Sequence, residues 1–152
     1  MDKNIKYKIS QVEKMLATLE RGIALYDKKL SIYKHDDEEV LSQRDSVIKR
    51  LEYSVDSFWK LIKLHLETVQ GIPLEATGTG PKPIARTAAL HHVISEQESL
   101  QLIDMIEERN KTSHMYKEEI ADEVAKHAPQ ALALMKSVVI RLKNNPIQRA
   151  HS

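Results

Sequence analysis

The chain has 152 residues, contains no cysteine and carries a net charge of only +1, although 30% of its residues are charged. A chain of this length can bury a core as one domain, and the lack of cysteine excludes disulfides, thiolate metal sites and a cysteine nucleophile. The balanced charge argues against a protein that coats nucleic acid, so any contact with RNA is expected to be local. No apolar run is long enough to span a bilayer and no signal peptide is evident, which predicts a cytoplasmic protein without a membrane partner.

Two long helices are predicted in the first half of the chain. Apolar residues recur at alternating steps of four and three residues, the spacing of an amphipathic helix. They are Ile5, Ile9, Val12, Leu16, Leu19, Ile23, Tyr26, Leu30 and Tyr33. The second helix is predicted over about 38–70, after Asp36 and Asp37, which can cap it. Its outer face is basic in places, with Lys49, Arg50, Lys60 and Lys63.

The second half of the chain begins with a predicted loop over 71–83, which holds three of the four glycines and three of the five prolines. It is not expected to be a domain boundary, because a helical hairpin on either side could not bury its own apolar stripe. Helices are predicted over 84–94, 95–109 and 117–126, and a last one from Pro129 to about Lys143. Residues 1–152 are thus expected to form one all-α domain, an antiparallel up-and-down bundle of four main helices plus short accessory helices, with a flexible tail at 145–152.

Residues 109–116 combine groups that suit phosphodiester chemistry: the guanidinium of Arg109, the imidazole of His114 and the phenol of Tyr116. Elsewhere the sequence shows no Gly-rich phosphate loop, no paired-carboxylate site and no credible metal cluster. From the spacing alone, Arg109 can equally be a cation at a helix C-terminus, with His114 a loop residue without function. The chemical hypothesis therefore depends on whether the chain brings these groups together.

The surroundings of the motif predict that it does. In a chain of 152 residues with seven arginines and seven histidines, an Arg-x4-His spacing is expected by chance about 0.3 times. Arg86 with His91 is a second example in this sequence. That pair lies in the predicted helix 84–94, which would place the two side chains about 140° apart around the helix axis. Arg109, in contrast, is followed by the polar residues 110–113, whose types favour helix ends. We therefore expect the chain to turn after Arg109 and to bring its guanidinium close to His114.

The pattern Arg109-Asn110-x3-His114-x-Tyr116, at the end of an inward-facing helix in a small all-α chain, resembles the signature of HEPN domains. More narrowly, it resembles the HepT toxins, also described as nucleotidyltransferase substrate-binding proteins. The similarity covers about residues 43–124. It includes Arg44-Asp45-x4-Arg50-x-Glu52, Phe58-Trp59-Lys60 with Lys63, and Pro83, Ala85-Arg86 and Ala89. The chain departs from the family at Leu102, where members often carry Trp.

The resemblance implies a homodimer in which two motifs face one another and form an endoribonuclease site without metal or cofactor. Arg109 and His114 would be the catalytic residues, supported by Asn110, with Arg109 on the scissile phosphate and His114 transferring protons. DNA would not be cut, because it lacks the attacking 2′-hydroxyl. Tyr116 would accept AMP from a cognate minimal nucleotidyltransferase, the antitoxin of a toxin–antitoxin pair.

Two other hypotheses remain open. The chain can be a non-catalytic subunit that presents a substrate to a two-component nucleotidyltransferase, with the same fold, dimer and partner. It can also be a helical interaction protein with a degenerate motif. The three hypotheses differ in whether Arg109 and His114 take part in chemistry.

Overall fold

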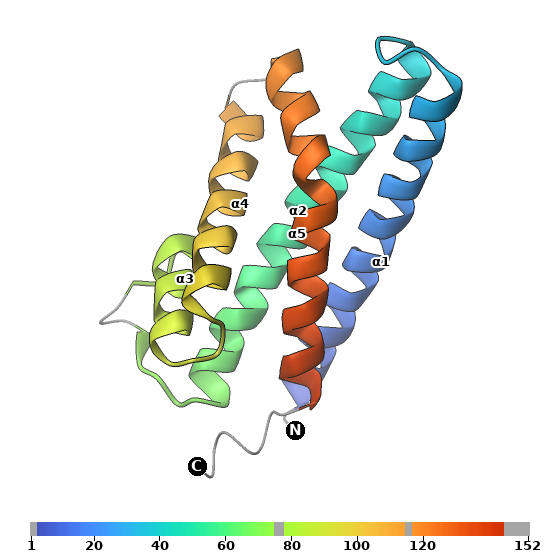
Figure 1. Cartoon of the computed structure of the whole chain (residues 1–152). Coiled ribbons are helices and arrows are strands. Elements are labelled where there is room, and N and C mark those ends of the chain that lie inside the picture. The colour runs from blue at the N-terminus through green and yellow to red at the C-terminus, as the bar shows by residue number, and fades with distance from the viewer. Residues whose placement is uncertain (1–2, 75–77, 115–116, 145–152) are drawn as a thin grey trace.

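The computed structural model describes residues 3–74, 78–114 and 117–144. Within these ranges the chain forms five helices and no strand. They are α1 (Lys3–Ile32), α2 (Glu38–Thr68), α3 (Pro81–Leu90), α4 (Glu96–His114) and α5 (Glu118–Asn144). The four long helices run alternately up and down, and short α3 packs beside α4 (Figure 1). The predicted antiparallel all-α bundle is confirmed.

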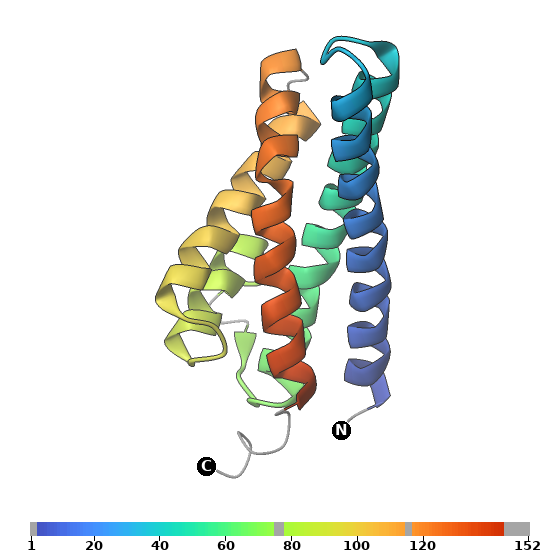
Figure 2. The same ribbon diagram turned by 45° about the vertical axis from the view of Figure 1, so that its right-hand side comes forward.

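Helix α2 contacts each of the other helices, and α5 packs against α1, α2 and α4, so these two helices enclose the core (Figure 2). The apolar stripe predicted in α1 faces this core over its first part, where its members from Ile5 to Leu19 are almost completely buried. The last two members, Leu30 and Tyr33, are exposed. The stripe is thus longer than the core that covers it.

Side-chain caps begin two of the helices at the predicted places. The carboxylate of Asp37 accepts a hydrogen bond from the backbone N–H of Glu39, at 2.8 Å, and so caps α2. Before α4, the hydroxyl of Ser95 accepts from the N–H of Glu98 at 3.0 Å, and the carboxylate of Glu98 accepts from the N–H of Ser95 at 2.8 Å. This reciprocal pair is the predicted capping box.

The prediction of a helix over 84–94 is wrong at both ends. Helix α3 begins at Pro81, a favourable first position for proline, and ends at Leu90. After it, His92 adopts a left-handed φ of 60°, and the N–H of Val93 donates to the carbonyl of Ala88 at 2.9 Å. This is the Schellman arrangement that ends helices, here with histidine where glycine is usual. It turns Val93 and Ile94 back into the core.

The prediction of two helices on either side of Pro129 is also wrong, because α5 runs through Pro129 without a break. A proline inside a helix costs about 3 kcal/mol or more. The apolar stripe of α5, however, is buried on both sides of it, with Ala125 and Ala128 before Pro129 and Leu132 and Met135 after it. A helix broken at Pro129 would misdirect half of this stripe, so packing favours the continuous helix. The predicted tail at 145–152 lies outside the described residues.

Candidate functional site

The predicted turn between Arg109 and His114 is wrong, because α4 continues to His114. The hydroxyl of Thr112 donates to the carbonyl of Arg109 at 2.8 Å and lies 3.1 Å from a carboxylate oxygen of Glu52 on α2. These contacts keep the last turns of α4 helical and against α2. Residues five positions apart on a helix lie about 140° apart around its axis. Arg109 and His114 of one chain therefore do not share a face. The side chain of His114 and all of Tyr116 lie outside the described residues.

Arg109 forms a bidentate ion pair with Asp56 of α2. Its Nε and Nη2 atoms each donate to a carboxylate oxygen of Asp56, both at 3.0 Å. The side chain of Arg109 remains 25% exposed and that of Asp56 37% exposed. The hydrogen bond to Asp56 raises the pKa of Arg109, against the opposing effect of partial burial. The guanidinium is therefore permanently charged and held in one orientation at the surface.

A cleft of about 280 Å³ borders this ion pair. Arg109 and Asn110 line it from α4, Trp59 and Lys60 from α2, and Pro81 from the start of α3. The Lys60 ammonium lies 5.8 Å from the centre of the Trp59 ring. Among the described residues that line the cleft, the charged side chains are those of Lys60, Arg109 and Asp56. Two cations therefore accompany one carboxylate, which gives the cleft a local excess of positive charge. A cation pair beside an aromatic ring can bind a phosphate and stack a base.

The sequence pattern identified Arg109 and Asn110 but not the α2 side of the cleft. Of the two neighbouring aromatic residues on α2, Phe58 is fully buried, whereas Trp59 is partly buried and packs against the core from the cleft side. Asp56 did not stand out in the sequence because the outer face of this helix is basic in places. A signal was present, since Glu52, Asp56 and Lys60 follow one another at steps of four residues. Such steps place side chains on one face of a helix.

A second arginine anchors the chain just after the motif. Arg44 of α2 is almost completely buried, and its Nη1 atom lies 2.7 Å from a carboxylate oxygen of Glu118 and 2.8 Å from one of Asp122. Both carboxylates belong to the first turns of α5. Arg44 therefore fixes the start of α5 against α2.

A potential metal-ligand group lies on another face of α4, although the sequence suggested no such cluster. Among the described residues, Glu108, Glu123 and His127 have ligand atoms that all lie within 4.8 Å of one another. The sequence search missed this group because Glu108 comes from α4 and the other two residues from α5.

The described residues form an all-α bundle with a cleft near the end of α4 that carries a local excess of positive charge. The chain belongs to the family described as nucleotidyltransferase substrate binding protein like, whose model matches residues 7–144. This confirms the HepT-like resemblance found in the sequence, and the family name implies association with a nucleotidyltransferase.

A crystal structure of a protein from Thermus thermophilus is similar to this chain, with 28% sequence identity and a TM-score of 0.69. The similarity covers 88% of this chain and 99% of that one. None of the curated proteins compared with the chain matches it significantly. Among the described helices, none is both long and apolar enough to cross a bilayer.

Proposed function

We propose that this protein is a HepT-like toxin, an endoribonuclease that needs no metal and is neutralised by a cognate minimal nucleotidyltransferase. The observation that carries the proposal is the cleft beside Arg109. It presents Arg109, Lys60 and Trp59 around a space of about 280 Å³, within a chain of nearly neutral charge. A phosphate in this cleft would lie between two cations, and a neighbouring base would have an aromatic surface on which to stack.

The proposed site is assembled from two copies of the chain. Because Arg109 and His114 lie on different faces of α4, the imidazole that works with Arg109 of one copy would be supplied by the other. His114 would take the proton from a ribose 2′-hydroxyl, whose oxygen attacks the adjacent phosphorus. The bond to the 5′-oxygen breaks, and the leaving oxygen receives a proton. The products are a 2′,3′-cyclic phosphate and a 5′-hydroxyl.

Arg109 would stabilise the negative charge that grows on the phosphate during this step. Asp56 would hold the guanidinium in position, and Asn110 on the same cleft wall would contact the phosphate or the sugar. DNA lacks the 2′-hydroxyl and would remain intact.

The decisive experiment is an RNA cleavage assay in excess chelator, with wild type, Arg109→Ala and His114→Ala. Each substitution should reduce cleavage by about a hundredfold or more while the fold remains intact. The chain offers a matched control in its second Arg-x4-His pair. Arg86→Ala and His91→Ala remove the same side chains from exposed positions at α3 and should leave cleavage unchanged. Mass spectrometry of the products should find cyclic phosphate ends. Equal activity in wild type and both motif variants would remove the catalytic assignment.

Neutralisation is proposed to occur by transfer of AMP to Tyr116. This residue lies two positions before α5, and a bulky anion attached there would compete for the phosphate site near Arg109. Tyr116→Phe should keep most of the cleavage activity but escape silencing when incubated with the partner nucleotidyltransferase and ATP. Tyr53→Phe, at an exposed position on α2, is the control that should still be modified. The mass of the intact protein shows whether AMP has been attached. AMP on the Tyr116→Phe variant would mean that another residue is the acceptor.

A second candidate function is a non-catalytic subunit that presents substrate to a nucleotidyltransferase. The family description favours it. In that case Arg109→Ala would weaken nucleotide transfer to the presented substrate, and purified protein would not cut RNA.

A further inference from the structure

Three side chains with the spacing of metal ligands meet between α4 and α5. Glu123 and His127 lie four positions apart on α5, so they project from the same face of that helix. Glu108 reaches across from α4, and its Oε1 atom lies 2.5 Å from Nδ1 of His127. The ligand atoms of all three residues lie within 4.8 Å of one another. Small side-chain rotations would bring them around a single ion.

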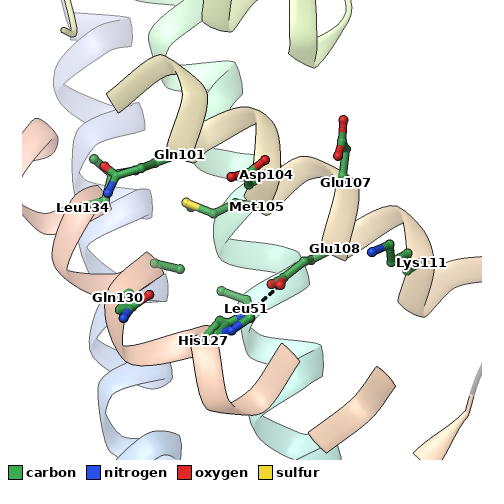
Figure 3. A pocket seen from close by; sticks show the side chains of 11 residues that line it. Leu51, Gln101, Asp104, Met105, Glu107, Glu108, Lys111, His127, Gln130 and Leu134 are labelled. Carbon is green, nitrogen blue, oxygen red and sulfur yellow. Dashed lines mark hydrogen bonds and ion pairs between the residues drawn. The ribbon is translucent and has the colours of Figure 1, made fainter. Parts of the chain in front are cut away.

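The surroundings of this group favour a cation. Glu108 and His127 line a cleft of about 270 Å³, with Leu51 of α2 among the other lining residues. Figure 3 shows Glu108 and His127 pointing toward one another, with Asp104 on the same helix as Glu108. The described lining residues include three carboxylates, those of Asp104, Glu107 and Glu108, and one permanent cation, Lys111; Glu107 is paired with Lys82, which does not line the cleft. Carboxylates therefore outnumber that cation even before Glu123 is counted.

We propose that Glu108, Glu123 and His127 form a site for a divalent transition-metal ion such as Zn²⁺. One imidazole nitrogen and two carboxylate oxygens are ligands that Zn²⁺ accepts, and the adjacent cleft leaves room for water at the remaining position. Imidazole favours such ions over Mg²⁺ and Ca²⁺, which prefer oxygen ligands alone. Binding would replace the hydrogen bond between Nδ1 of His127 and Oε1 of Glu108; a neutral imidazole would then carry its one proton on Nε2, whereas an imidazolium would release one proton to solvent.

The ion would clamp α4 to α5 on either side of the connection that contains Tyr116. Glu108 lies six positions before the end of α4, and Glu123 five positions after the start of α5. The ion would not enter the cleavage step, because Arg109 faces α2 whereas Glu108 faces α5. This inference is independent of the proposed ribonuclease activity.

Titration of tag-free, metal-free protein with Zn²⁺ in a calorimeter tests the site. Wild type should bind one ion per chain, and at a free concentration of about a hundred times Kd its melting temperature should rise by roughly 5–10 °C. His127→Ala, Glu108→Gln and Glu123→Gln should each weaken binding, with His127→Ala losing about a hundredfold. Co²⁺ should give a ligand-field absorption band that His127→Ala removes. Mg²⁺ should produce neither binding nor stabilisation.

Two controls separate this site from adventitious binding. Glu107→Gln changes the neighbouring carboxylate, which pairs with Lys82 instead, and should leave the affinity unchanged. His91→Ala with His92→Ala removes two adjacent exposed histidines and should also have no effect. Zn²⁺ binding that survives His127→Ala, or that disappears with the His91 and His92 pair, would overturn the proposal. If His127→Ala fails to fold, the Zn²⁺ affinities of Glu108→Gln and Glu123→Gln test the site instead. Unchanged affinity in both variants would also overturn the proposal.

Discussion

Arg44 and Arg109 make similar contacts in opposite surroundings. Each is paired with carboxylates across an interface that involves α2. The side chain of Arg44 is only 2% exposed, and it contacts Asp45 of its own helix together with Glu118 and Asp122 of α5. Arg109 contacts Asp56, stays 25% exposed and borders a cleft.

The difference shows that burial, rather than the ion pair itself, separates a structural arginine from one that can bind a ligand. A guanidinium withdrawn from water must keep its carboxylates, because an unpaired charge there would be costly. An arginine at the rim of a cleft can exchange contacts with little loss, because water solvates whatever is left unpaired. Arg44 is thus suited to hold α5 in place, and Arg109 to meet a phosphate.

The largest effect on stability is expected from Arg44→Ala. It removes a buried side chain and leaves three carboxylates close together without their shared cation, which should lower the free energy of unfolding by about 3 kcal/mol. Denaturant titration measures this, with Arg21→Ala, at an exposed position on α1, as the control. A loss no larger than that of the control would mean that burial does not distinguish the two arginines.

An intermediate effect is expected where the carboxylate, rather than the arginine, is the more buried partner. Glu98 is 17% exposed and Arg141 is 38% exposed. Burial acts to raise the pKa of Glu98, but the hydrogen bonds from Arg141 and from the backbone of Ser95 outweigh it and lower that pKa. Glu98→Gln retains the capping pattern while it removes the charge, and should cost about 1 kcal/mol at neutral pH.

The pH dependence of this effect follows from the lowered pKa. The charged form of Glu98 stabilises the folded state fully above the pKa of an unfolded glutamate, about 4.3. The contribution is lost as the pH falls through the lower pKa of the folded state. The difference in unfolding free energy between wild type and Glu98→Gln should therefore shrink below about pH 4. A difference that stays constant from about pH 7 to about pH 3 would contradict the role of the charge.

The smallest effect on stability is expected from Arg109→Ala. Its ion pair with Asp56 is partly exposed, so its removal should change the free energy of unfolding by about 0.5 kcal/mol. A double-mutant cycle with Asp56→Ala, measured by denaturant titration, should find a coupling energy below about 1 kcal/mol. A coupling of several kcal/mol would make Arg109 a structural residue like Arg44 and would weaken the case for a ligand site.

Predictions from the sequence were most accurate where structure depends on local spacing. The alternating steps of four and three residues in α1 produce a buried stripe, and Asp37 and the Ser95–Glu98 pair begin their helices as expected. Each of these features is decided by residues within one or two helical turns. The motif around Arg109 was likewise sufficient to indicate the family.

Helix ends were predicted less well, because packing can override a local preference. The polar residues 110–113 favour a helix end, yet Thr112 meets Glu52 on α2 and α4 continues to His114. Pro129 favours a helix start, yet the buried stripe of α5 continues through it. Both errors come from weighing local propensity without the contacts across the bundle.

By itself, the sequence determined the all-α class, the first two long helices, two caps and the residues of the motif, since these follow from periodicity and from the chemistry of neighbouring side chains. Only the tertiary structure decided that Arg109 pairs with Asp56, 53 positions away, that Lys60 and Trp59 share its cleft, and that Glu108 meets His127 across α4 and α5. These contacts depend on which face of each helix meets its neighbour. Helix packing sets those faces through many small apolar contacts, and no short stretch of sequence contains them.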